Sequence, residues 1–387
     1  MTTRLAPTKP PTPPTRVHLV YPHGNKASTP DSIGREVGRR LELRYQVIYH
    51  DWMDHAVVKP EPGDVLVGHP HPDPNTIFRR SVREDGWHRK LLLGPYHHGD
   101  LRQNAFVDSI LRDCDLFLAI TGPHWFRTIG DSPCSHWLPK MAHLDLAIDR
   151  KDFPPLKKSF GAPGKRRVLY IGHTSRGKNT SYLTEIAALL PEIEFGWIGK
   201  GVRPIHGFTT HGFVDYDSPS GKELLAGFDL FLTVGNADAN PTTILEAMAW
   251  GLIPVCTPTS GYDGIPSVAN VPLGDAAAAA AVVGGLLFAD ESDLLAMQAA
   301  NWKSLDDHYN WDRFAGQVIE AIDSTASPAL GPESPKRRLE FALYDLTSPY
   351  GPMAHRRAGK VVMNLRRRWK GMRAARAAQT SGRHIQR

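Results

Sequence analysis

The chain has 387 residues, of which 41% are hydrophobic, which is enough for two or three domains with apolar cores. Its net charge is +6, but residues 336–387 hold 14 Lys or Arg against two acids, so residues 1–335 carry −6. An acidic body excludes a basic nucleic-acid groove running through it, and the basic end predicts a segment that seeks polyanions.

The start of the chain and its cysteines indicate the compartment. Residues 1–15 are polar and Pro-rich, which predicts a disordered start and neither a signal peptide nor an anchor. No apolar run approaches the ~20 residues of a spanning helix. Cys114, Cys134 and Cys256 lack metal-type spacing and favour a reduced compartment. We therefore expect a cytoplasmic protein.

Strands alternate with helices along the first 150 residues. Apolar runs bounded by turn residues predict strands at 17–21, 45–49, 64–68, 90–94 and 116–121. Helices are predicted at 32–41, with Asp31 as N-cap, and at 100–112. This alternation is typical of a doubly wound parallel sheet with ligands at the strand carboxyl ends. Residues 16–150 are therefore predicted to form a Rossmann-like domain.

The second half repeats this alternation. A Pro-, Gly- and Lys-rich linker at 151–165 precedes a domain at 166–322. Strands are predicted at 167–172, 195–198, 211–214, 230–234 and around Val271, and helices at 181–190, 243–250, 276–287, 291–305 and 311–322. Residues 323–387 are predicted to be a Pro-rich break followed by a basic helical tail. The predicted fold is thus α/β, with two doubly wound domains facing a cleft and a basic extension.

Two carboxylates flank the turn between the 230–234 strand and the following helix. Asp238 lies on the loop, and Glu246 lies one to two turns into a helix that begins near Pro241 and is closed by Gly251. The free N–H groups of the first helical turn suit a phosphate. One carboxylate is then placed to hold a sugar and the other a ribose, with a diphosphate between them.

This segment resembles the Glu-x7-Glu signature of the retaining GT-B glycosyltransferases of family 4. The match runs through Pro241, Thr243-Ile-Leu-Glu-Ala-Met-Ala249 and Gly251, and Asp238 replaces the first Glu. The resemblance implies that Glu246 binds the donor ribose and that Asp238 binds hydroxyls of the transferred sugar. It also implies a GT-B fold, retention of configuration and a cross-back helix at 311–322.

Further landmarks follow in the family's order. A strand ends at Gly172, and Lys178 stands where the family has a diphosphate-binding Lys, whereas His173 replaces the usual Arg and Arg176 offers a substitute charge. Phe213 lies in a Gly-Phe-Val segment that resembles the one along the nucleotide base. The implied donor site also includes Asn240, Thr242 and Thr243.

The acceptor side falls on the N-terminal domain. His97 and His98 follow the 90–94 strand and match a family His near the sugar, so either is a candidate to orient the acceptor or stabilise charge. The cluster His69-Pro-His71-Pro-Asp73 is held extended by its prolines and is not expected to bind metal. We expect no cofactor and no metal, because basic groups and helix N-termini serve the diphosphate.

The resulting hypothesis is a glycosyltransferase that uses a nucleotide-diphosphate sugar and a glycan or lipid-linked polysaccharide precursor. Residues 356–378 place Val362, Leu365, Trp369 and Met372 on one stripe among cations, which favours an anionic membrane surface or packing on the N-terminal domain. Binding of nucleic acid, as by a DNA-base glycosyltransferase, ranks third. Two competing hypotheses are a degenerate GT-B protein that binds without turnover and a sugar-nucleotide epimerase.

Overall fold

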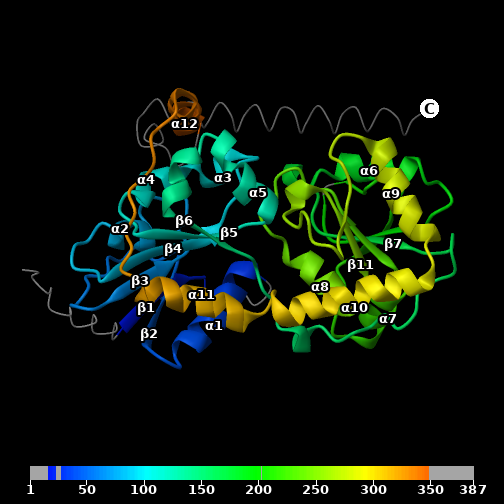
Figure 1. Ribbon diagram of the computed structural model, residues 1–387, viewed down its shortest axis with the longest axis horizontal. Coiled ribbons are helices and arrows are strands. Elements are labelled where there is room, and N and C mark those ends of the chain that lie inside the picture. The colour runs from blue at the N-terminus through cyan, green and yellow to red at the C-terminus, as the bar shows by residue number, and fades with distance from the viewer. Residues whose placement is uncertain (1–15, 23–27, 202, 348–387) are drawn as a thin grey trace, which may run out of the picture.

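The computed structural model describes residues 16–22, 28–201 and 203–347. They form two domains, each built on a six-stranded parallel sheet with helices against it (Figure 1). The predicted α/β class with paired doubly wound sheets is confirmed.

The N-terminal sheet has the strand order β2-β1-β3-β4-β5-β6. Its strands are β1 (Arg16–Tyr21), β2 (Gln46–Asp51), β3 (Val65–Gly68), β4 (Arg89–Pro95), β5 (Leu116–Ile120) and β6 (Met141–Leu144). Its helices are α1 (Thr29–Leu41), α2 (Ile77–Ser81), α3 (Leu101–Asn104), α4 (Asp108–Leu111) and α5 (Pro123–Thr128), with a 3₁₀ turn η1 (Ala105–Val107) between α3 and α4.

The C-terminal sheet has the order β12-β11-β10-β7-β8-β9. Its strands are β7 (Val168–Ile171), β8 (Phe195–Ile198), β9 (Thr209–Gly212), β10 (Leu230–Thr233), β11 (Ile253–Cys256) and β12 (Ala269–Asn270). The helices are α6 (Thr180–Ala188), α7 (Pro219–Ala226), α8 (Thr242–Trp250), α9 (Ala276–Phe288) and α10 (Glu291–Asp307). In both sheets the order reverses beside the first strand, which opens a crevice at the carboxyl ends.

Several predicted details were wrong. The N-cap of α1 is Ser28, whose side chain accepts a hydrogen bond from the backbone N–H of Asp31. The predicted helix 100–112 is broken because Asn104 leaves the helical region at φ −136°. Strand β11 was missed because Pro254 lies within it, and proline argues against a central strand.

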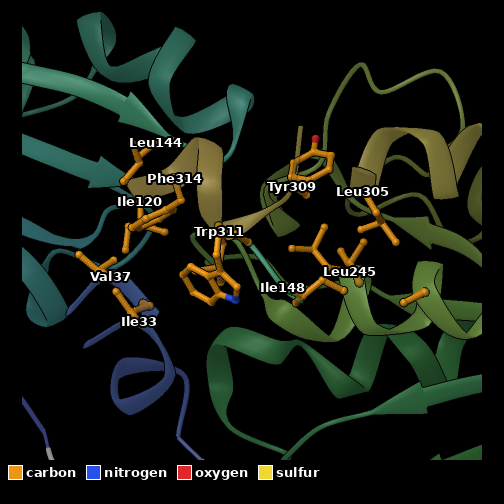
Figure 2. Close-up of a cluster of buried hydrophobic side chains, with 14 of the residues drawn as sticks. Ile33, Val37, Ile120, Leu144, Ile148, Leu245, Leu305, Tyr309, Trp311 and Phe314 are labelled. Atoms are coloured by element: carbon orange, nitrogen blue, oxygen red, sulfur yellow. The ribbon is translucent and has the colours of Figure 1, made fainter. Parts of the chain in front are cut away.

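Helix α11 (Trp311–Asp323) follows α10 and returns to the N-terminal domain, where it packs on α1. Its N-cap Asn310 side chain accepts from the Arg313 N–H, and its apolar face is buried. Figure 2 shows Trp311 and Phe314 on the side of α1, while Tyr309 lies toward Leu245 of the C-terminal domain. One apolar cluster therefore spans both domains and fixes how they meet.

Helix α12 (Pro335–Thr347) packs on the N-terminal domain. Arg337 pairs with Asp108, and the Phe341 ring stacks on Trp137 with centroids 6.2 Å apart. The predicted basic stripe at 356–378 lies outside the described residues, as do residues 1–15. Within the described part of the chain, no helix has the length and apolar character needed to span a bilayer.

Candidate active site

A cavity of about 500 Å³ lies between the two domains. Its walls come from the loops that follow β3 and β4 in one domain and β7 and β10 in the other. Both sheets therefore present their carboxyl ends to it, which is where open α/β sheets bind ligands.

The C-terminal wall brings together Lys178 and Asp238. Lys178 ends a 3₁₀ turn after β7, Asp238 lies on the loop after β10, and the ammonium group donates a hydrogen bond to the Asp238 carboxylate. Each side chain keeps about a fifth of its surface exposed, 20% and 19% respectively. The sequence separates these residues by 60 positions, and the sheet order puts β7 beside β10.

Helix α8 begins at the same loop. Pro241 is its N-cap, so Thr242 and Thr243 form the first turn, whose N–H groups lack intrahelical acceptors. Gly251 ends the helix in the left-handed region, at φ 93°, as expected from the sequence. A partial positive charge therefore lies at the start of α8, beside Asp238.

Glu246 lies on α8 outside the residues that line this cavity. Burial raises the pKa of Glu246 to about 7, against a weaker opposing hydrogen bond from Thr242. Burial, followed by the nearby charge of Glu246, also raises the pKa of Tyr216. The side chain is only partly buried by surface area, so solvent or a ligand hydroxyl can still reach it. A carboxyl poised near neutral pH in this position suits hydrogen bonds with a diol.

Gly172, Gly199 and Gly212 lie at the carboxyl ends of the neighbouring strands β7, β8 and β9. We call these three residues the glycine ledge. The Gly172 N–H donates to Ile198 C=O at 3.0 Å, and the Gly199 N–H donates to Gly212 C=O at 2.9 Å. Gly172 and Gly199 have φ values of 150° and 153°, and a Cβ on Gly199 would collide with the Gly172 carbonyl. Only glycine allows this close approach, and it leaves backbone open to a ligand.

Phe213 continues from this ledge and is 80% exposed, with the Lys200 ammonium 5.6 Å from its ring centroid. An exposed ring beside a glycine ledge offers a surface for a planar base. Its assignment to the donor site stays a prediction.

The two predicted histidines occupy different positions. His97 is buried and lines the cavity. His98 lies outside that lining, and both of its ring nitrogens are engaged, Nδ1 with Tyr96 Oη at 3.1 Å and Nε2 with Thr128 Oγ1 at 3.2 Å. Burial lowers the pKa of His98 to about 4. His97 therefore lines the interdomain cavity, whereas His98 lines the neighbouring hollow that also holds Arg176, and the functional role of each stays a prediction.

His173 and Arg176 differ in a similar way. His173 lines the cavity and is exposed, and its Nδ1 accepts from the Ser175 N–H at 3.3 Å. Arg176 lies in a neighbouring hollow together with Arg102, and Gly177 borders both spaces. Lys178 is thus the predicted diphosphate cation that reaches the cavity itself.

His69 was missed as a site residue. It follows β3, lines the cavity, and packs edge-on against Trp52 with centroids 5.0 Å apart. Burial lowers the pKa of His69 to about 4, so the ring is neutral at pH 7. Its His-Pro-His pattern indicates only metal-ligand chemistry, which gave no reason to place it beside a substrate. The described residues hold no group of three or more His, Cys, Asp or Glu placed to bind a metal ion.

The N-terminal domain also holds the Asp238 loop directly. Trp125 of α5 donates its indole N–H to the Asp238 carbonyl at 2.6 Å, and the Gly122 N–H donates to the Ala239 carbonyl at 2.8 Å. Trp125 was not predicted, because no local pattern marks a contact between segments 113 residues apart. Domain contact and placement of Asp238 are therefore coupled.

Asn240 belongs to this interface rather than to an open donor surface. Its side-chain oxygen accepts from the Leu146 N–H at 2.6 Å, and its amide donates to the Gly261 carbonyl at 3.3 Å. The side chain is buried, and both of its groups are used. The Asn240 side chain therefore links the two domains, and its assignment to the donor site stays a prediction.

Comparison with solved structures defines the class of fold as GT-B, the two-domain glycosyltransferase architecture. A sucrose-phosphate synthase from Thermosynechococcus elongatus aligns with a TM-score of 0.59 at 12% identity, over 79% of this chain and 98% of that chain. A glycosyltransferase from Rickettsia africae aligns at 0.57 and 11%, over 80% and 98%.

Anabaena Alr3699/HepE, solved in complex with UDP and glucose, aligns with a TM-score of 0.54 at 11% identity, over 80% of this chain and 99% of that chain. No protein-family model matches the sequence, and no curated protein matches it. The structural likenesses therefore establish the fold, and the chemistry has to be argued from the site.

Proposed function

We propose that this protein is a retaining glycosyltransferase of the family 4 type, which transfers a sugar from a nucleotide-diphosphate donor to a hydroxyl-bearing acceptor. The observation that carries the proposal is the meeting of Lys178 and Asp238 at one wall of the interdomain cavity, with α8 beginning on the same loop as Asp238, just beyond the cavity lining. A cation, a carboxylate and a helix N-terminus are the groups that a sugar diphosphate requires.

Negative charge builds up on the diphosphate as it leaves. As the bond from the anomeric carbon to the diphosphate oxygen breaks, its electron pair leaves with that oxygen. Lys178 and the first-turn N–H groups of α8 stabilise this charge, with Arg176 at the mouth of the neighbouring hollow. No metal is required in this scheme. Asp238, freed from Lys178 as the phosphate takes its place, accepts hydrogen bonds from sugar hydroxyls.

The nucleoside part of the donor fits the face beyond the cavity. Glu246 accepts hydrogen bonds from the ribose hydroxyls, and the base lies along the ledge of Gly172, Gly199 and Gly212 toward Phe213. Anabaena Alr3699/HepE was solved with UDP and glucose. A uridine or guanosine donor is consistent with this arrangement.

The acceptor hydroxyl enters from the side of His97. Its oxygen bonds to the anomeric carbon on the face from which the diphosphate departs, and its proton passes to the leaving diphosphate. This path gives retention without a covalent intermediate. The basic segment at 356–378 would hold the enzyme at an anionic membrane surface.

A panel of UDP-, GDP- and ADP-sugars tests the proposal. The donor is expected to raise the melting temperature of the full chain, because a ligand of the native state stabilises it. Release of the nucleoside diphosphate, with the sugar recovered on an acceptor by mass spectrometry, is the expected activity. A chain that melts at the same temperature with every donor contradicts the proposal.

A second candidate is a protein that binds the nucleotide sugar without turnover. The pairing of Lys178 with Asp238 favours it, because the shorter carboxylate neutralises the cation that the diphosphate needs. A donor that raises the melting temperature but releases no diphosphate with any acceptor would favour this candidate.

A further inference from the structure

The N-terminal wall of the interdomain cavity has an apolar floor. Leu92 of β4, Phe117 of β5, and Phe106 and Val107 of η1 line it, with Pro70 beside them. All five are buried. A polyhydroxylated sugar needs a hydrogen-bonding partner for most of its hydroxyls, and these side chains offer none.

Two side chains on this wall, Asn104 and His69, present hydrogen-bond acceptors to the cavity. Asn104 is 6% exposed, and its Nδ2 donates to the His97 carbonyl at 2.6 Å. Because a carbonyl can only accept, this bond fixes which way the amide faces. Asn104 Oδ1 is then a buried acceptor with no hydrogen-bond partner among the described residues. Such a group costs about 1–3 kcal/mol when left unsatisfied.

His69 adds a second acceptor. Its Nδ1 lies 3.1 Å from the Pro70 carbonyl, so Nδ1 carries the proton and Nε2 carries the lone pair. Asn104 Oδ1 and His69 Nε2 both accept hydrogen bonds, so a ligand that donates a hydrogen bond would pair with either atom. A hydroxyl group is such a donor.

Gly94 leaves room above the floor. It lies on β4 in the cavity lining, and an added Cβ would stand 3.6 Å from His69 Cδ2 and from Pro70 Cδ. These are ordinary contacts, so the backbone tolerates a side chain there. Because Gly94 has no side chain, the cavity is wider beside His69 and Pro70.

We infer that the N-terminal wall binds the acceptor by a compact apolar group, aromatic or alkyl, rather than by a glycan chain. This rests on the proposed transfer reaction and narrows its acceptor. Until transfer begins, the acceptor hydroxyl donates its single proton to Asn104 Oδ1 or to His69 Nε2. The acceptor oxygen forms the new bond to the anomeric carbon, the diphosphate leaves with the electron pair, and the hydroxyl proton goes to the diphosphate.

Three probes test the acceptor class on the full chain: 4-nitrophenol, 1-octanol and maltotriose. Calorimetry measures their binding, and diphosphate release is followed with the donor that shifts the melting temperature. Binding and glycosylation of 4-nitrophenol alone would define an aromatic acceptor, and those of 1-octanol an alkyl one. Either result supports the inference. Glycosylation of maltotriose with neither apolar probe bound would overturn it.

Gly94→Val places two methyl groups in the cavity without touching Lys178 or Asp238. It is expected to weaken binding of the apolar probe at least about tenfold, with the melting shift caused by the donor unchanged. Gly94→Ala gives a smaller effect in the same direction and keeps the test valid if the valine variant does not fold. The control is Gly316→Ala on α11, where an added Cβ meets no atom within 4 Å.

The two kinds of failure are distinguishable. Unchanged probe binding in folded Gly94→Val would overturn the apolar pocket, whatever the donor does. Gly94-dependent binding of 4-nitrophenol by a protein that takes no nucleotide sugar would overturn the proposed transfer reaction and leave the apolar pocket in place.

Discussion

The two walls of the interdomain cavity are built by different means. The C-terminal wall uses charge, because Lys178 and Asp238 come from two loops beside the strand reversal and pair with each other there. The N-terminal wall is largely apolar, with His69 and His97 beside Leu92 and Phe117 in the cavity lining. A sugar diphosphate is bound by the same few kinds of group in different proteins, such as a cation and a helix N-terminus, whereas acceptors differ widely in shape. The wall to which we assign the diphosphate is therefore the one that carries a short sequence motif.

The largest expected effect is on the charged wall. Lys178→Ala removes the cation that faces the leaving diphosphate, and kcat/KM is expected to fall on the order of 100-fold, as for loss of one charge-stabilising donor. Lys303→Ala is the control, because Lys303 is 76% exposed and pairs with Asp307 on its own helix α10. Diphosphate release at near-normal rates in Lys178→Ala would remove this residue from the site.

The next largest effect is expected at a contact between the two domains. Asp145 follows β6 and bridges His143 and His308 at 3.2 and 2.8 Å, and His308 follows α10 of the other domain. Burial alone would raise the pKa of Asp145, but its two histidine partners lower it to about 2. Asp145→Asn is expected to reduce the free energy of unfolding by about 2 kcal/mol at pH 6, measured in urea.

The pH dependence of this bridge follows from its partners. The lowered pKa of Asp145 means that its contribution is present above pH 4 and is lost as pH falls toward 2. Burial lowers the pKa of His143, but Asp145 raises it above its ordinary value, so this contribution fades as pH rises beyond 6.5. The gap between wild type and Asp145→Asn should therefore be widest between pH 4 and 6.5. A constant gap from pH 3 to 8 would rule out the ionic bridge.

A smaller effect tests Glu246 on the nucleotide face. Glu246→Gln is expected to lower kcat/KM about tenfold through weaker ribose binding. Because the native pKa is raised to about 7, the wild type loses stability as pH rises from about 4.5 to 7. The variant should therefore melt higher than wild type at pH 8 and equally at pH 4.5. A melting temperature of Glu246→Gln below that of the wild type at pH 8 would contradict the raised pKa of Glu246.

The smallest effect tests whether the N-terminal domain positions Asp238. Trp125→Phe deletes the indole N–H that holds the Asp238 carbonyl, and kcat is expected to fall about threefold, as for one neutral hydrogen bond. Trp302→Phe is a matched control, since that indole donates at 3.2 Å to Ala249 within the C-terminal domain. Equal activity in the two variants, with equal loss of stability, would make Trp125 merely structural.

The sequence predicted most elements because their signals are local. The apolar strand ending at Thr233 and the Gly251 stop of α8 depend on residues within one turn of each other. The failures came where tertiary contacts override local preference. Asn104 breaks the 100–112 helix to bond the His97 carbonyl, and Pro254 occupies a central strand.

The residues of the candidate site likewise divide into those that a local motif predicted and those that only the tertiary structure revealed. Lys178 and Asp238 were predicted from a motif and lie together in the structure, whereas His69 and Trp125 were not recognised as site residues. His97 could not be separated from His98 by sequence, because adjacent residues on a loop share every local signal. Only the positions of Tyr96 and Thr128 around His98 distinguish the two.

The sequence by itself determined two doubly wound sheets and the charged turn before α8, because chain-local periodicity and a short motif encode both. The tertiary structure decided which histidine lines the interdomain cavity, that Asn240 joins the domains, and that the N-terminal wall of the cavity is largely apolar. These properties depend on contacts between residues that are far apart in the sequence. Leu146 and Asn240, for example, are 94 positions apart, and their hydrogen bond exists only after both sheets have formed and met.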